Sequence, residues 1–307
     1  MIKTLAAQIK EFKKDSVLTP IFMILEVLFE TMIPFLMASI IDKGVETGNI
    51  WHICKVGIAM AILALCGLWA GMMGAKYASR ASAGFARNLR KAMYDNIQTF
   101  SFSNIDKFST AGLITRLTTD VTNLQMAYQM LLRMFTRAPA SLICAMVMAF
   151  TINAELASIY LVAVIGLGIC LVLIMSRATK YFQQVFKKYD ELNASVQENI
   201  SGIRVVKAYV REDYENNKFF KAAENVYKMF IKAENIIVAN MPLMMFAVYA
   251  CILGLSWLGA NMIVVGDLTT GELMSLLTYC MNIMMSLMML SMIFVMVTMS
   301  FASAERI

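Results

Sequence analysis

Charged side chains are scarce in this sequence. Only 16% of the 307 residues are charged and 59% are hydrophobic, whereas an average soluble domain has roughly 25% charged residues. This composition excludes an ordinary water-soluble domain. A membrane-spanning helix needs about 20 mostly apolar residues, and apolar runs of that length occur at 17–41, 51–78, 133–152, 156–176, 236–265 and 273–300. The sequence therefore predicts an all-α membrane protein with six transmembrane helices.

Motifs for metal and nucleotide binding are also missing. His52 is the only histidine, and the six cysteines fall inside or at the edge of apolar runs without CxxC spacing, so we expect no metal site. No glycine is directly followed by lysine, and a P-loop requires that pair. We therefore expect no catalytic residue, no cofactor and no ATPase activity in this chain by itself.

Basic residues are concentrated in alternate connecting segments. All of the 27 Lys and Arg residues except Lys43 and Lys55 fall in segments 1–16, 76–137, 177–235 and the C-terminal tail. Because positive residues accumulate on the cytoplasmic side of a membrane, we expect both termini in the cytoplasm and the chain in the plasma membrane. The anionic inner leaflet also accounts for the net charge of +6 without a nucleic-acid partner.

Two cytoplasmic loops, at about 79–132 and 177–235, are unusually long for loops and contain no proline. Apolar residues recur in them at helical spacing, for example Leu89, Met93 and Ile97, which predicts helices that extend well beyond the membrane. At the N-terminus, the apolar residues of segment 1–15 recur at helical spacing, and the lysines fall on the other sides of the helix. We expect this segment to form an amphipathic elbow helix on the inner leaflet, followed by the six-helix domain at 16–307.

Small residues recur every four positions in the second apolar run, as Gly67, Gly71, Ala75 and Ser79. Such a ridge allows another helix backbone to approach closely.

Two polar stretches interrupt the long loops. The stretch 108–120 reads FSTAGLITRLTTD, and the stretch 198–213 reads ENISGIRVVKAYVRED. Both resemble the intracellular-loop signatures of ATP-binding cassette (ABC) exporters of the six-helix half-transporter type. The segments 33–35 (IPF), 41–44 (IDKG), 266–273 (GDLTTGEL) and 302–307 (ASAERI) also resemble this family, in particular its bacterial multidrug-type members, and the resemblance extends along nearly the whole chain.

The resemblance implies a second transmembrane half, with a heterodimer favoured over a homodimer, and nucleotide-binding domains that use ATP and Mg²⁺. Such a domain is absent from this sequence, and we favour a truncated chain over a separately encoded ATPase. It also implies two coupling helices that contact the ATPase domains. The first is expected at Ser109, Thr110, Ala111, Gly112 and Leu113, and the second at Ala208, Tyr209, Val210, Arg211 and Glu212.

Two features predict a substrate cavity. Glu26 and Glu30 are four residues apart in the first apolar run and share one helix face, where a carboxylate at membrane depth is costly and usually functional. No basic residue within the apolar runs offers them an obvious partner, and we expect them to bind cationic or polar substrates. The alternative is that one or both are protonated or form a hydrogen bond with a neighbouring helix. The sixth run carries Met274 and a series of methionines on one face: Met281, Met285, Met288, Met292, Met296 and Met299.

Methionine side chains adapt to apolar ligands of different shapes, but ordinary helix packing explains the series equally well. The implied function is export of hydrophobic or amphipathic drugs, lipids or peptides by alternating access. The alternatives are an importer-type permease served by a separate ATPase, an ion-driven secondary transporter, for which broken helices at the midplane are expected, and a structural or receptor-like membrane protein.

Overall fold

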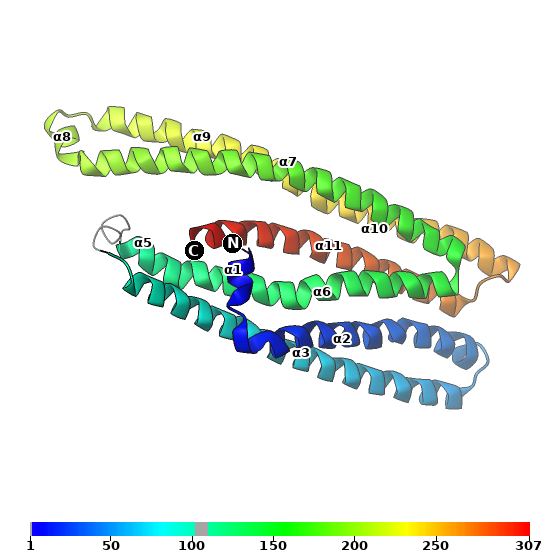
Figure 1. Ribbon diagram of the computed structural model, residues 1–307. Helices are drawn as coiled ribbons and strands as arrows, with labels where there is room; N and C mark the ends of the chain where they lie inside the picture. The colour runs from blue at the N-terminus through cyan, green and yellow to red at the C-terminus, as the bar shows by residue number, and fades with distance from the viewer. Residues whose placement is uncertain (1, 102–109) are drawn as a thin grey trace. The chain divides into compact units, whose positions relative to one another are not determined.

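The computed structural model describes residues 2–101 and 110–307, and this part of the chain is helical with no β-strand (Figure 1). The helices follow in the order α1 (Ile2–Ala7), η1 (Lys10–Phe12), α2 (Lys13–Ile40), η2 (Ile41–Val45), α3 (Ile50–Gln98), α5 (Thr110–Thr115), η3 (Arg116–Asp120), α6 (Val121–Ile152), α7 (Ala154–Ser201), α8 (Ile203–Ala208), α9 (Glu212–Val238), α10 (Asn240–Val265) and α11 (Thr270–Arg306).

Six helices of the described chain are long and apolar enough to cross a membrane. This confirms the predicted fold class. The long loops are continuous with the spans, since α3 and α7 run for 49 and 48 residues without a break, about twice the length that a membrane requires. The N-terminal segment differs in detail from the expected single helix, because α1 ends at Ala7 and a short 3₁₀ turn, η1, leads into α2.

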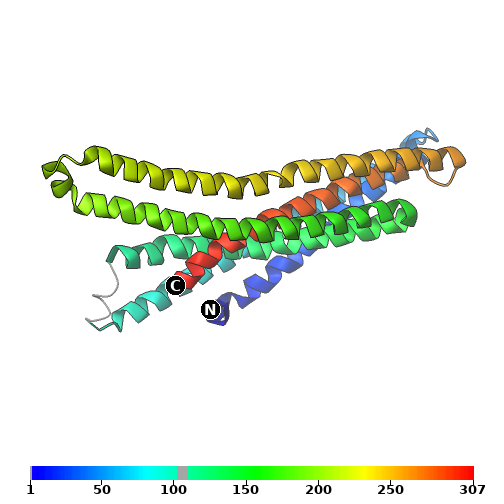
Figure 2. The same ribbon diagram turned by 90° about the horizontal axis from the view of Figure 1, so that it is seen from above.

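The chain forms two compact units, which we describe separately. The first, here called the bundle, contains residues 1–164 and 251–307, and the second, here called the hairpin, contains residues 165–250. In the bundle, α2 packs against α3 and α6, and α11 packs against α6 and α2 (Figure 1). In the hairpin, α7 and α9 run alongside each other and are joined through α8 (Figure 2).

Small residues of α3 bring α2 close in the bundle. A Cβ added at Gly74 would lie 2.2 Å from the Met23 Cε atom, and one added at Gly71 would lie 3.0 Å from the Glu26 carboxyl carbon. The glycines therefore let side chains of α2 lie directly against the α3 backbone, and a larger residue would force Met23 or Glu26 to shift. Of the predicted ridge, Gly67 and Gly71 do face α2, but the fully buried row is shifted to Ala70, Gly74, Ala78 and Ala81.

Buried hydrogen bonds fasten α11 to α2. The Tyr279 hydroxyl donates to the Thr31 carbonyl at 2.7 Å, and the Ser275 hydroxyl donates to the Pro34 carbonyl at 2.6 Å. At the start of α11, the Asp42 carboxylate accepts from the Gly271 amide at 2.8 Å. Because every one of these donors lies on the first three turns of α11, this end of the helix is held in a defined position against α2.

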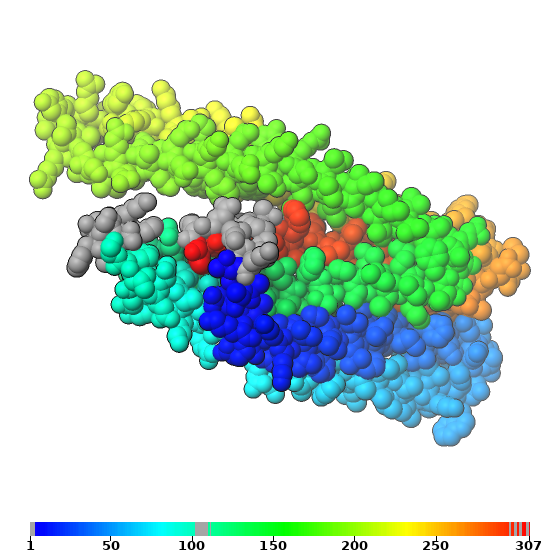
Figure 3. All heavy atoms as spheres, in the orientation of Figure 1, coloured from blue at the N-terminus to red at the C-terminus, as the bar shows by residue number. Residues whose placement is uncertain are grey.

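The other end of the bundle is closed by the N-terminal segment. Leu5 and Ile9 pack against an apolar cluster formed by α3, α6 and the end of α11, and Figure 3 shows this segment (blue) lying on the surface of α3 and α6. Glu11 forms an ion pair with Arg87 of α3, and the Asn88 amide donates to the Gln8 carbonyl at 3.1 Å. The segment is therefore anchored by both apolar and polar contacts.

Candidate substrate-facing site

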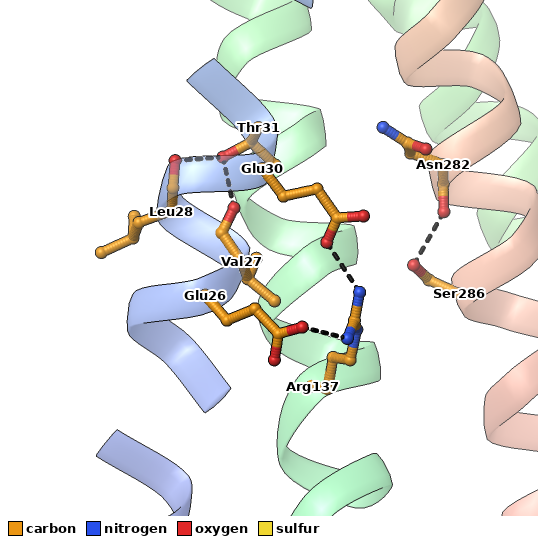
Figure 4. A network of polar contacts seen from close by, with 8 residues as sticks. All are labelled: Glu26, Val27, Leu28, Glu30, Thr31, Arg137, Asn282 and Ser286. Atoms are coloured by element: carbon orange, nitrogen blue, oxygen red, sulfur yellow. Dashed lines mark hydrogen bonds and ion pairs between the residues drawn. The ribbon is translucent and has the colours of Figure 1, made fainter. Parts of the chain in front are cut away.

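Glu26 and Glu30 of α2 are bridged by one arginine from α6. Arg137 Nη1 donates to Glu26 Oε1 and Arg137 Nη2 donates to Glu30 Oε2, each at 2.7 Å (Figure 4). We call these three residues the carboxylate–arginine network. The expectation that the carboxylates lack a basic partner is therefore wrong, because Arg137, a residue of the third apolar run, lies beside α2 in the fold.

The three side chains of the network differ in exposure. The Glu26 side chain is 18% exposed, that of Arg137 32% and that of Glu30 53%. Glu26 Oε2 is buried without a hydrogen-bond partner among the described residues, and its carboxyl group is confined by Gly71. Two carboxylates and one guanidinium leave a formal charge of −1, so the network remains electronegative with Glu30 as its accessible end.

An amide of α11 lies near this network. In Figure 4 the Asn282 side chain projects from α11 toward the side on which Glu30 and Arg137 lie. Its own contact is on α11, where the Ser286 hydroxyl donates to the Asn282 backbone carbonyl at 2.7 Å. Sequence reasoning missed Asn282, although a single amide between methionines in an apolar helix is the signal that could have indicated it.

The methionine series forms the open face of α11. Met274, Met281, Met285 and Met292 are exposed, while Tyr279, Ile283 and Leu287 on the opposite face are buried. Met288 and Met296 are half-buried, and the Met299 side chain lies outside the described part. The exposed methionines therefore do not belong to the core of the bundle.

The two expected coupling helices are placed differently by the structure. Thr110, Ala111, Gly112 and Leu113 lie in α5, a short helix as expected, whereas Ser109 lies outside the described residues. In the second stretch the short helix is α8, which ends at Ala208. Tyr209, Val210 and Arg211 instead form a turn, and Glu212 begins α9. The expected helix at 208–212 is thus wrong by about one turn.

The turn after α8 has a defined geometry. Val210 has a φ of +51°, which is uncommon for a β-branched residue, and an ion pair of 3.1 Å between Lys207 and Glu212 spans the turn. Tyr209 and Val210 are 75% and 81% exposed. The turn thus displays one aromatic and one aliphatic side chain at its surface.

Comparison with known proteins assigns the chain. The family model described as "ABC transporter transmembrane region" matches residues 17–288. The chain belongs to this family. The uncharacterized ABC transporter ATP-binding protein YfiB of Bacillus subtilis is 32% identical over 94% of this chain and 50% of its own length.

Two further relatives match in the same way. An uncharacterized ABC transporter ATP-binding protein of Mycobacterium tuberculosis is 29% identical over 100% of this chain and 53% of its own. A protein of Rickettsia typhi whose name describes an export ATP-binding/permease protein is 23% identical over 91% of this chain and 48% of its own. The ABC transmembrane region described here thus spans about half the length of the curated relatives it matches.

Proposed function

We propose that this ABC transmembrane region is one half of an ATP-driven exporter that moves hydrophobic or amphipathic compounds out of the cytoplasm by alternating access. It pairs with a second half, in a heterodimer by preference, and with nucleotide-binding domains that supply ATP and Mg²⁺ chemistry. Both termini are cytoplasmic in a protein of the plasma membrane. The observation that carries the proposal is that, within the bundle, α11 exposes methionines along one side and α2 exposes the Glu30 carboxylate.

The face suits amphipathic substrates for a physical reason. Exposed methionines offer polarizable, adaptable contact to apolar bodies, while Glu30 and the net negative network offer an electrostatic contact to a polar or cationic group. Met281, Met285 and Met292 are the exposed members, and we assign Met288, Met296 and Met299 to the same lining.

In this proposal, the two coupling segments transmit movements of the ATPase domains to the transmembrane helices. Residues 109–113 and 208–212 touch the ATPase domains, and the long helices α3 and α7 carry the displacement into the membrane as rigid levers. Tyr209, at 75% exposure, is the side chain best placed for contact with an ATPase domain. Arg211, two residues further on, occupies the position just before α9.

Transport and hydrolysis in the complete transporter test this assignment. ATP-dependent uptake of a fluorescent amphipathic dye into inside-out vesicles is expected, with no loss when a protonophore removes the ion gradient. Tyr209→Ala is expected to lower dye transport several-fold per ATP hydrolysed, whereas Tyr214→Ala, which removes an exposed tyrosine of α9, is expected to leave that ratio unchanged. Transport that follows the ion gradient and ignores ATP would instead identify a secondary transporter.

A further inference from the structure

The carboxylate–arginine network is asymmetric. Arg137 binds a confined carboxylate at one end and an accessible carboxylate at the other, at equal distances of 2.7 Å. Glu26 is held between Arg137 and Gly71, so its position has little freedom. Glu30 is 53% exposed, so water can replace Arg137 as its partner. Separation of the guanidinium from Glu30 therefore costs less than separation from Glu26.

We propose that Arg137 competes with the cationic group of the substrate for the Glu30 carboxylate. Without substrate, the Arg137 guanidinium is paired with Glu30 as well as with Glu26. A lipophilic cation displaces Arg137 from the Glu30 carboxylate, while Arg137 remains paired with Glu26. Arg137 is thus a specificity-determining residue. The proposal rests on the assignment of this face to substrate, but it concerns how the face discriminates among ligands.

Competition of this kind has a defined selective effect. An internal ion pair must be broken before a cation gains its own pair, so the net electrostatic gain is small and the apolar body must supply most of the affinity. Small hydrated cations are rejected because they bring no apolar surface. A lipophilic cation is retained because its body contacts the methionine face of α11 while its charge contacts Glu30.

A neighbouring arginine provides a matched control. Arg133 lies one turn before Arg137 on α6, and it forms no ion pair with any residue that the structure describes. Its charge contributes to the same region without contacting either carboxylate. Arg133→Met and Arg137→Met therefore remove the same charge and introduce the same side chain, but only Arg137→Met releases Glu30.

Binding of tetraphenylphosphonium and tetraphenylborate, two ions of the same shape and opposite charge, tests the proposal. The complete nucleotide-free transporter is reconstituted in nanodiscs, and empty nanodiscs correct for partition into lipid. Four proteins are compared: the unmodified transporter, Arg137→Met, Arg133→Met and the double variant Glu26→Gln/Arg137→Met. The double variant keeps the formal charge of −1 but has no competitor, so it separates competition from net charge. Thermal unfolding confirms that each variant is folded.

We expect Arg137→Met and the double variant to bind tetraphenylphosphonium about three- to tenfold more tightly than the unmodified protein. Arg133→Met is expected to change the affinity for tetraphenylphosphonium less than twofold, and the affinity for tetraphenylborate is expected not to rise in any variant, because none of them adds net positive charge.

The opposite results have distinct meanings. Cation affinity in the double variant equal to that of the unmodified protein would overturn the proposal, because net charge alone would then explain the gain in Arg137→Met. Weaker cation binding in both Arg137 variants would also overturn it and would identify Arg137 as a structural clamp. Saturable cation binding in none of the proteins would reject the inference, while ATP-driven transport of neutral compounds would leave the proposed exporter function standing.

Discussion

The bundle and the hairpin are built from the same kind of long apolar helix but are stabilised in different ways. In the bundle, glycine and alanine bring helices together, and buried hydroxyls such as that of Tyr279 bond to a neighbouring helix. In the hairpin, α7 and α9 meet through the tips of long side chains: the Phe182 and Phe230 rings lie 6.3 Å apart in a T-shaped arrangement, and Lys218 pairs with Glu198 at 2.7 Å.

This difference teaches where the chain depends on other molecules. Many large apolar residues of the hairpin are exposed, including Phe186 and Phe220, and contacts at side-chain tips stabilise a helix pair less than close backbone packing does. The bundle has an internal core of its own, whereas the exposed apolar side chains of the hairpin lack such a core and can be covered by lipid. Four predictions compare the two units, in order of decreasing effect.

The largest effect is expected from a methyl group at the start of α11. Gly271→Ala places a Cβ 2.5 Å from the Ala38 carbonyl oxygen, and relief of such overpacking costs about 1–3 kcal/mol. The matched change in the hairpin, Gly168→Ala, meets no atom within 4 Å and is expected to be neutral or stabilising by up to about 1 kcal/mol. Thermal unfolding of both variants measures the contrast, and equal losses would show that the hairpin is as tightly packed as the bundle.

A selective effect on transport is expected from the network of the bundle. Glu26→Gln with Glu30→Gln leaves Arg137 without a carboxylate and changes the formal charge of the network from −1 to +1. Transport of a cationic dye by the complete transporter is expected to fall on the order of tenfold, about 1.4 kcal/mol, and that of a neutral dye of similar size much less.

Glu198→Gln is the control for that experiment, because it breaks an ion pair of the hairpin. It should change both dyes equally. If the double variant also reduces transport of both dyes to the same extent, the two carboxylates support packing and not recognition of charge.

A smaller effect is expected from the aromatic contact of the hairpin. Phe182→Leu keeps an apolar side chain but removes the edge-to-face ring contact, which is worth about 0.5–1.5 kcal/mol. Phe186→Leu is the control, because Phe186 lies one turn further along α7 and its side chain is exposed. Hydrogen exchange of the α9 amides is expected to accelerate in the first variant only. Acceleration in both variants would mean that the change in helix propensity, and not the loss of the ring contact, determines the exchange rate.

The smallest effect is expected from the surface ion pair of the hairpin. Lys218→Ala removes the partner of a Glu198 side chain that is 70% exposed, and solvent screens such pairs. The unfolding temperature is expected to stay within experimental error. A clear decrease, abolished by high salt, would show that this ion pair is a principal link between α7 and α9.

Sequence periodicity and composition predicted the helical fold well and the site in part. The six spans and the continuous helices of the long loops were correct, because hydropathy and 3.6-residue periodicity are local properties. The exposed methionine face was also visible in the spacing of α11. The register of the second short helix was wrong, because α8 ends where Tyr209, Val210 and Arg211 turn, and a turn with a positive φ at valine has no sequence signal.

The sequence by itself determined which segments are helical, which of them are apolar enough to span a membrane, and that Glu26 and Glu30 share a helix face. Only the tertiary structure decided that Arg137 joins them. Its partners precede it by 111 and 107 residues, and no local pattern encodes such a pairing. The physical reason is the close contact of α2 with α6: helix packing brings a guanidinium from the middle of α6 to two carboxylates in the apolar part of α2.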